Sequence, residues 1–410
     1  DYTPKEQRIR NYINDTLRSI FERFGYNPIE TPILCYYDIL SDKYDNEADI
    51  LNEIYKLTDQ GNRTLGLRYD LTVPFAKFIA LNKNELKIPF KRYEIAKSFR
   101  DGPVKVGRDR EFTQCDIDVV GIGGELIEAE LLSIFDVAFK ELDIPIIIKY
   151  NNRKLMTGLI IESNASLESI PAITTILDKL EKISEEEIIE TLQNKGLNRT
   201  DVLNLLSNFK LNLKELIEKY QNTNNEILKK GLEEIKNLTN YLKELELLDI
   251  CEFTPSLARG QNYYTGNVFE VYDADNRITS SIGAGGRYDN MITNFIDDGE
   301  QYPAVGISFG LSALYEILKN RECFNEKSAI DIFIIPMNTK IESLRLANTL
   351  RKLNFSVEME FTEKKLKKSI AFADKENIPY AIIFGEDELN NNKIKIKDML
   401  NKNEFEISLE

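Results

Sequence analysis

The stretch PFKRYEIAKSFRDGPVKVGRDREFTQCDIDVVG, residues 89–121, decides how this chain folds. Its apolar runs at 93–96 and 117–120 predict two strands inside a sheet. Cations alternate with these runs, among them Lys91, Arg92, Arg100, Arg108 and Arg110, and acids follow at Glu111, Asp116 and Asp118. Arginine presents a rigid, permanently charged fork of hydrogen-bond donors. We therefore expect these arginines to face a shared cavity that binds an anionic, nitrogen-rich ligand.

The same charges allow a plainer interpretation. A run of charged residues commonly forms a solvated face, so the stretch is equally compatible with an exposed, salt-bridged hairpin. Residues 89–121 alone do not distinguish a binding cavity from such a hairpin, so the choice depends on other segments of the chain.

The bulk composition is that of an ordinary globular protein. The chain has 410 residues, of which 42% are hydrophobic and 30% are charged, and this length predicts two or three domains. No apolar run approaches a membrane span. The four cysteines are far apart and form no CxxC pair, which favours a reducing, cytoplasmic location without disulfides or a zinc site.

Two further numbers restrict the function. The net charge of −15 argues against broad, non-specific nucleic-acid binding, so we expect no DNA partner, although a local basic patch can still bind a polyanion. Histidine is absent, which removes the commonest general base and the commonest metal ligand. Chemistry would then depend on carboxylates, arginines, hydroxyls or a metal held by oxygen, and we assign no metal-ligating residue.

The composition and the periodicity of the sequence change along the chain. Residues 1–162 and 248–325 mix periodic helices with strands and glycine clusters, and predict one core. Residues 163–247 are rich in Leu, Ile, Lys, Glu and Asn at a period of 3.6, which predicts a helical insertion. Residues 326–410 alternate strands with helices, and predict a small α/β domain with a largely parallel sheet.

Several local elements are predicted specifically enough to be checked. Thr3 and Pro4 predict the start of a helix. Residues 29–34 predict a strand that Pro32 would place at an edge or an interface. We also predict strands over 263–272 and 279–282, and a strand that runs into a helix over 304–318.

Five segments together resemble the histidyl branch of the class II aminoacyl-tRNA synthetase family. They are RYDLTVPFAKFIA (68–80), residues 89–121, LARGQNYYTGNVFE (257–270), GAGGRYDN (283–290) and KKLKKSIAFADKENIPYAIIFGEDEL (364–389). The RGxxYYTG pattern is the most diagnostic, and the resemblance runs nearly end to end. It implies an α+β fold: an antiparallel sheet core flanked by helices, a helical insertion, and a C-terminal anticodon-binding-like α/β domain. It also implies a homodimer formed through the first helix and residues 29–34.

The resemblance implies a histidine pocket beside an ATP pocket. The α-amino group would be held by Asp70, Thr72 and Gln114. The imidazole would be held by Asp118 and Tyr264, and the walls would be Tyr263 and Tyr288. Arg259 would hold the carboxylate and then the α-phosphate. The ATP pocket would use Arg100 on the α-phosphate, Phe112 on the adenine, and Arg108 and Arg110 along the phosphates. Considered one at a time, these residues also have plainer structural interpretations. Asp70 could cap a helix, and the tyrosines could be ordinary aromatic residues of a strand.

The activity that this resemblance implies is that of a histidine–tRNA ligase. L-Histidine would be activated with ATP and Mg²⁺ to histidyl-adenylate and pyrophosphate, and then transferred to tRNA(His). The attacking carboxylate is already ionised and needs no general base, so catalysis would consist of positioning and electrostatic stabilisation. This chemistry is compatible with a protein that lacks histidine.

The chain departs from the family pattern at three places. Gly102 stands where a glutamate is usual, Ala313 where an arginine is usual, and Gln261-Asn262 where Leu-Asp is usual. The first two fall in the ATP pocket, while the histidine pocket matches. This asymmetry motivates an alternative, a histidine-sensing regulatory subunit of ATP phosphoribosyltransferase that does not charge tRNA. The anticodon-binding-like domain and the four matching arginines favour the ligase.

Overall fold

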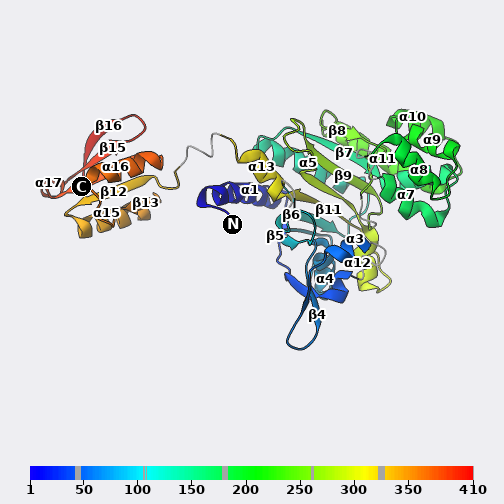
Figure 1. Ribbon diagram of the computed structural model, residues 1–410, viewed down its shortest axis with the longest axis horizontal. Helices are drawn as coiled ribbons and strands as arrows, with labels where there is room; N and C mark the ends of the chain where they lie inside the picture. Colours follow the sequence, from blue (N-terminus) through cyan, green and yellow to red (C-terminus); the bar gives the residue numbers. More distant parts are fainter. Residues whose placement is uncertain are drawn as a thin grey trace. The chain divides into compact units, whose positions relative to one another are not determined.

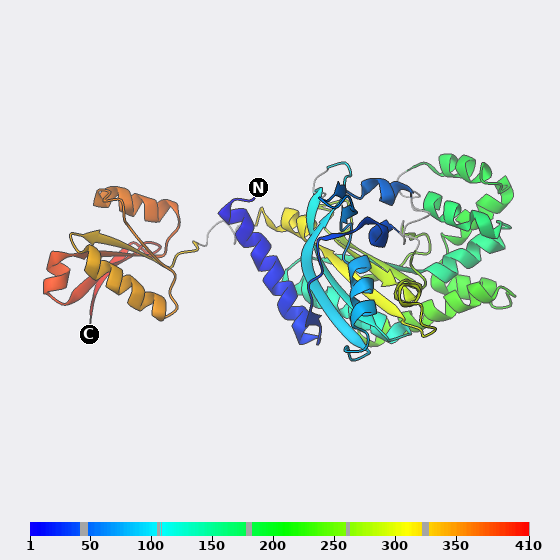
Figure 2. The same cartoon turned by 90° about the horizontal axis from the view of Figure 1, so that it is seen from below.

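The computed structural model describes residues 1–41, 48–104, 107, 109–177, 183–259, 263–321 and 328–409. The chain forms two compact units, residues 1–319 and residues 320–410. Figure 1 shows both units, and Figure 2 shows them from below. Among the described residues, no helix combines the length and the apolar character needed to cross a membrane.

A central sheet organises the first unit. Within the described residues it has eight strands in the order β1-β5-β6-β11-β10-β9-β7-β8. Their bounds are Asn27–Pro28 (β1), Phe90–Phe99 (β5), Glu111–Val120 (β6), Ala304–Gly310 (β11), Gly283–Arg287 (β10), Asn267–Asp273 (β9), Ile146–Asn152 (β7) and Cys251–Phe253 (β8). The six inner strands pair antiparallel, and only the edge pairs β1–β5 and β7–β8 are parallel. The predicted antiparallel core is confirmed.

The stretch 89–121 forms the hairpin β5–β6, in which Phe90 lies opposite Val120 and Phe99 lies opposite Glu111. Successive side chains of a strand point to opposite faces. Cys115, Ile117 and Val119 are therefore buried on one face of β6. The alternate residues Gln114, Asp116 and Asp118 lie on the other face, where they line a cavity.

Three helices cover the apolar face of this sheet: α1 (Pro4–Arg23), α5 (Glu125–Glu141) and α13 (Leu311–Leu318). The predicted start of α1 is confirmed, because the Thr3 hydroxyl accepts from the Glu6 backbone N–H at 3.4 Å and the Glu6 carboxylate accepts from the Thr3 N–H at 2.7 Å. The Phe21 ring of α1 packs against the rings of Tyr93 and Phe309. Figure 2 shows α1 lying along the sheet.

A smaller layer lies beyond the hairpin. It contains the sheet β2 (Leu34–Tyr36), β4 (Thr64–Leu67) and β3 (Lys56–Thr58), in that order, with helices α2 (Tyr37–Ser41), α3 (Ala48–Glu53), α4 (Thr72–Asn82) and α12 (Asp289–Ile296). Helix α4 packs on α12. The N-terminus of α4 carries Thr72, which lines the same cavity as strand β6.

Two strand predictions are wrong. Residues 29–33 form no strand, since β1 ends at Pro28 and β2 begins at Leu34. Instead, the Thr31 N–H and hydroxyl donate to the Glu94 carboxylate at 2.8 and 2.9 Å, and Pro32 has no N–H to give to a ladder. The strand predicted over 279–282 begins only at Gly283. The strand predicted over 263–272 is shorter and begins at Asn267.

Six helices form a helical layer at the far edge of the sheet: α6 (Arg153–Glu162), α7 (Ile170–Leu177), α8 (Glu185–Gln193), α9 (Arg199–Asn208), α10 (Leu213–Tyr220) and α11 (Glu226–Glu244), as the described residues show (Figure 1). They share a core of their own that includes Leu155, Ile188 and Leu205. Gly158 and Gly231 let α6 and α11 touch, because a Cβ at Gly231 would lie 2.2 Å from the Leu155 nitrogen. The sequence predicted helices over residues 163–247 from their 3.6 period, and α6 lies before that range.

The second unit contains a five-stranded sheet in the order β13-β12-β14-β15-β16 among its described residues. The strands are Ile332–Met337 (β12), Val357–Met359 (β13), Tyr380–Gly385 (β14), Lys393–Asp398 (β15) and Asn403–Ser408 (β16), with helices α15 (Lys340–Lys352), α16 (Leu366–Lys375) and α17 (Glu386–Asn390). The first three strands pair parallel, whereas β15 and β16 add antiparallel pairs. The expected largely parallel sheet is therefore mixed.

Candidate active site

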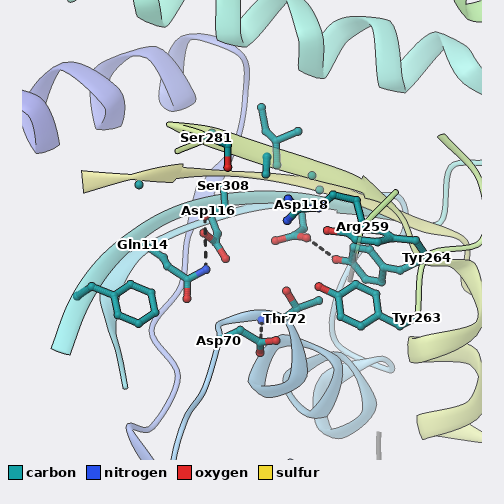
Figure 3. A pocket seen from close by; sticks show the side chains of 18 of the residues that line it. Asp70, Thr72, Gln114, Asp116, Asp118, Arg259, Tyr263, Tyr264, Ser281 and Ser308 are labelled. Atoms are coloured by element: carbon teal, nitrogen blue, oxygen red, sulfur yellow. Dashed lines mark hydrogen bonds between the residues drawn. The ribbon is translucent and has the colours of Figure 1, made fainter. Parts of the chain in front are cut away.

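A cavity of about 240 Å³ opens on the polar face of the central sheet. Ten of the twelve site residues predicted from the sequence line it: Asp70, Thr72, Arg100, Phe112, Gln114, Asp118, Arg259, Tyr263, Tyr264 and Tyr288. Figure 3 shows Asp70 and Thr72 facing the strand that carries Gln114, Asp116 and Asp118, with Arg259 and the tyrosines at one end. Segments far apart in the sequence thus supply one site.

The N-terminus of α4 brings one acid into the cavity. The Asp70 Oδ1 accepts from the backbone N–H groups of Thr72 and Val73, each at 3.1 Å. Asp70 therefore caps the helix, as its plainer interpretation required, and also lines the cavity. The cap fixes the direction of the carboxylate, because it satisfies two N–H groups that a helix start leaves free.

A ladder of buried charges supports Asp118 from below. The Arg92 Nη2 lies 2.6 Å from the Asp118 Oδ2, and the Arg92 Nη1 lies 3.8 Å from Glu94. Glu94 in turn lies 3.1 Å from the Arg68 Nη1. Burial raises the pKa of Asp118, and the Arg92 guanidinium opposes that rise. The Tyr288 hydroxyl donates to the other Asp118 oxygen, so both oxygens of this carboxylate are held.

Glycines make room for this carboxylate. Gly306 lies opposite Asp118 in the β11–β6 register. A Cβ at Gly306 would lie 1.9 Å from the Asp118 Oδ1, and a Cβ at Gly286 would lie 2.8 Å from the Tyr264 ring. The first five residues of the cluster GAGGRYDN form strand β10, and the glycines of β10 and β11 leave space for side chains from neighbouring segments.

Arg259 lies at the tyrosine end of the cavity. Its guanidinium pairs with Glu270 of β9, whose other oxygen accepts from the Tyr272 hydroxyl. This partner raises the pKa of Arg259 although burial opposes the rise. The Tyr263 ring lies 4.6 Å from the Tyr264 ring and 6.1 Å from the Tyr288 ring, measured between centroids. The arginine is thus held between an acid and an aromatic wall.

Arg100 occupies the opposite end. Its guanidinium carbon lies 4.1 Å from the centre of the Tyr69 ring and 5.0 Å from that of Phe112. Its Nε donates to the Tyr69 carbonyl at 3.3 Å. No ion pair in the described part of the chain includes Arg100, and the two rings orient it instead, so its charge is suited to an anionic ligand.

Comparison with known proteins places this site in a family. The family described as histidyl-tRNA synthetase matches residues 1–314, and the anticodon binding domain matches residues 331–410. The chain belongs to the histidyl-tRNA synthetase family. The resemblance found in the sequence and the predicted aminoacyl-tRNA ligase activity are confirmed.

Individual relatives agree. "Histidine--tRNA ligase 1" of Bacillus cereus is 44% identical over 414 residues, covering 100% of this chain and 96% of the relative. "Histidine--tRNA ligase 2" of Shouchella clausii is 40% identical over 401 residues, covering 97% and 94%. The crystal structure of histidyl-tRNA synthetase from Nostoc sp. PCC 7120 superposes with a TM-score of 0.87 at 30% identity, covering 100% and 95% of the chains.

The alternative function has a structural relative but is not favoured. A structure titled as an ATP phosphoribosyltransferase regulatory subunit/histidyl-tRNA synthetase from Bacillus halodurans has a TM-score of 0.78 at 21% identity, covering 94% of this chain and 96% of that one. This likeness shows the fold alone. The ligases are about twice as similar in sequence and match the whole chain.

The expectation that the arginines of residues 89–121 share the cavity is confirmed for Arg100 and wrong for Arg92 and Arg110. Arg100 lines the cavity, but Arg92 is fully buried beneath it. Arg110 does not line it: its side chain is 59% exposed and lies 3.7 Å from Asp101. Arg108 lies outside the described residues, as do Gln261 and Asn262. The ladder of buried charges explains why Arg92 is buried there, since a buried guanidinium needs paired carboxylates.

Asp116, Ser281 and Ser308 also line the cavity. The sequence indicated Asp116 as one of the acids of residues 89–121 but gave it no role, and nothing in the sequence indicated the two serines. Glu53 lies beside Gly102, where an added Cβ would be 3.1 Å from its carboxylate, and it accepts from the Tyr69 hydroxyl at 3.0 Å. An acid therefore stands next to the position that usually holds the family's glutamate.

Proposed function

We propose that this cavity activates L-histidine with ATP and passes the activated amino acid to tRNA(His). The observation that carries the proposal is the polarity of the cavity, whose lining includes three carboxylates and two arginines: Asp70, Asp116, Asp118, Arg100 and Arg259. A zwitterionic amino acid bound beside a nucleotide phosphate needs this arrangement: acceptors for its N–H groups, and cations for the carboxylate and the phosphate.

The proposed roles follow the positions of the side chains. Asp70, Thr72 and Gln114 hold the α-ammonium group, and Asp118 and Tyr264 hold the imidazole nitrogens. Tyr263 and Tyr288 form the wall. The Gln114 amide donates to Ser308 at 3.4 Å, which leaves its oxygen to accept from the ligand. Paired polar groups of this kind reject apolar isosteres, because binding them leaves buried partners unsatisfied.

The reaction needs positioning more than proton transfer. A carboxylate oxygen of histidine attacks the α-phosphorus of ATP, the bond to the bridging oxygen breaks, and pyrophosphate leaves. Arg259 and Arg100 stabilise the charge that spreads over the α-phosphate, and Phe112 stacks on the adenine. Cations preorganised around developing charge lower the barrier without reorganisation. Arg110 and Arg108 would lie farther along the phosphates.

Mg²⁺ enters this proposal with the nucleotide. Among the described residues, no group of three or more Cys, Asp or Glu side chains is placed to hold a metal ion. Mg²⁺ commonly binds through one or two carboxylates and substrate phosphates, so we propose MgATP as the substrate.

Histidine-dependent exchange between ATP and labelled pyrophosphate tests the first step. We expect exchange with L-histidine and none with the other amino acids, followed by transfer of labelled histidine to tRNA(His). Binding of histidine by calorimetry without any exchange would contradict the proposal, and would favour a histidine sensor with an inactive ATP site.

The second unit is the proposed tRNA-binding part. It matches the anticodon binding domain, and α16 with the residues before it exposes Lys364, Lys365, Lys367 and Lys368. Exposed lysines close together give a net acidic protein a local site for phosphates. We also propose that the protein works in the cytoplasm, where tRNA is charged.

We further propose that the chain forms a homodimer. The three-stranded sheet and the residue before β2 expose large apolar side chains, each by at least 41%: Ile33, Leu34, Tyr36 and Leu57. Large exposed apolar patches favour association. Light scattering should give twice the mass of the 47.3 kDa chain. Leu34→Glu should shift the protein toward the monomer, whereas Leu167→Glu, at an exposed leucine of the helical layer, should not. A stable wild-type monomer at micromolar concentration would contradict this.

A further inference from the structure

Asp116 is a buried acid in the cavity that no step above uses. It is 4% exposed, and its position on β6 lies between Gln114 and Asp118 on the cavity face. Its Oδ1 has no hydrogen-bond partner among the described residues. A buried ionised carboxylate is costly unless it is paired, so this oxygen requires an explanation.

The surrounding protein does not supply the missing partner. Arg92 is the cation beneath the site, but its ion pairs are with Asp118 and Glu94. Among the described residues, none of the ion pairs includes Asp116. The Ser308 hydroxyl bonds to it, but a hydroxyl does not neutralise a charge. When it is ionised, Asp116 therefore carries a negative charge that no ion pair among the described residues balances, and it faces the space for the ligand.

We propose that Asp116 is a further specificity-determining residue of the histidine pocket, and that its carboxylate accepts a hydrogen bond from an N–H group of the bound amino acid. This inference rests on the proposed function. Two N–H donors of histidine have the right chemistry, the α-ammonium and the imidazole ring. Both lie within the proposed pocket, because the acceptors assigned to them flank Asp116 along β6.

The titration of Asp116 agrees with this role. Burial raises its pKa to about 7, against the opposing effect of Arg92 and with the help of Asp118 and Asp70. These groups, with Ser308, face Asp116 from β5, β6, the segment before α4, and β11. A ligand N–H that bonds to the carboxylate favours its charged form, so histidine binding should release the proton that the free protein holds there near neutral pH.

The test is the isosteric variant Asp116→Asn with Glu128→Gln as its matched control. Both remove one buried carboxylate whose pKa is raised to about 7, but only Asp116 lines the cavity. In the exchange assay, we expect Asp116→Asn to raise the KM for histidine about tenfold, the effect of losing a hydrogen bond to a charged group. The KM for ATP should change little. An equal change in the histidine KM for both variants would overturn the proposal.

Two inhibitors distinguish the donors. Histidinol carries the ring and the ammonium group, whereas imidazole-4-propionate lacks the ammonium. If Asp116→Asn weakens the binding of histidinol alone, the partner is the α-ammonium, and if it weakens both, the partner is the ring. Unchanged binding of both would overturn the proposal. Calorimetry with these ligands does not require exchange activity, so it tests Asp116 even if the proposed reaction fails.

Stability against pH separates this role from a structural one. The pKa of Asp116 lies above the ordinary value of 3.8, so its protonated form favours folding at low pH, and that contribution is lost as the pH rises to about 7. Asp116→Asn should therefore raise the Tm relative to wild type, by more at pH 8 than at pH 5, and the difference should vanish only below about pH 3.8. A lower Tm at both values would assign Asp116 to the fold instead.

Discussion

Replacing Arg259 by alanine should lower histidine-dependent ATP–pyrophosphate exchange by roughly 10²–10³-fold, the effect of removing one preorganised donor from a transition state. The guanidinium lines the cavity, and Glu270 holds it in place. Its proposed partners are the histidine carboxylate and then the α-phosphate. The additional charge on the α-phosphate oxygens develops only in the transition state, so losing that contact should lower kcat, and losing the contact with the histidine carboxylate should raise the KM for histidine.

The matched control is Arg277→Ala. Arg277 also forms an ion pair with an acid of β9, Asp273 at 2.6 Å, but it does not line the cavity. We expect it to retain exchange activity. Arg259→Lys keeps a charge without the planar fork and should give an intermediate rate. Exchange that survives Arg259→Ala at the wild-type rate would remove this arginine from the proposed mechanism.

The sequence predicted the architecture of the core well because its signals are local. Each signal lies within one short segment of the chain. Examples are the capping box at Thr3 and Glu6, the apolar stripe of α1 and the 3.6 period of the helical layer. The hairpin β5–β6 follows from alternation in one stretch of 33 residues. Such patterns need no knowledge of distant segments.

The errors arose where tertiary partners override the local pattern. Residues 29–34 have strand-like composition, but Thr31 bonds to the buried Glu94 carboxylate instead of a neighbouring strand. Gly283–Arg287 is a strand with poor strand propensity. It exists because β9 and β11 pair with it on both sides. Neither partner can be identified from the segment itself.

Charge placement was the hardest part of the site to predict. The composition of residues 89–121 does not distinguish an arginine that faces a ligand from one that supports an acid. Arg92 lies on β5, and Arg100 directly follows the end of the same strand. Arg100 is stacked between rings in the cavity, whereas Arg92 is buried under Asp118. The Arg68–Glu94–Arg92–Asp118 ladder joins three segments, and only the fold brings them together.

Because that ladder holds Asp118 in place, a substitution at the neighbouring Gly306 should have a large effect on histidine binding. Gly306→Ala should raise the KM for histidine by about 100-fold, because the new Cβ would lie 1.9 Å from the Asp118 Oδ1, and a displacement of about 1 Å in an active site can cost that much. Asp118 has no room to retreat, since Arg92 and Tyr288 hold its two oxygens. The added methyl group must therefore move either the acid or strand β11.

Gly310→Ala on the same strand is the control for this prediction. A Cβ there would meet only the Ile282 carbonyl at 3.7 Å and the Ala313 Cβ at 3.8 Å, which are ordinary contacts, so the histidine KM should stay near that of wild type. Equilibrium binding of histidine by calorimetry measures both variants without ATP. If Gly306→Ala binds histidine as tightly as wild type while remaining folded, the carboxylate of Asp118 does not set the affinity, and the imidazole must be recognised from the tyrosine side of the cavity.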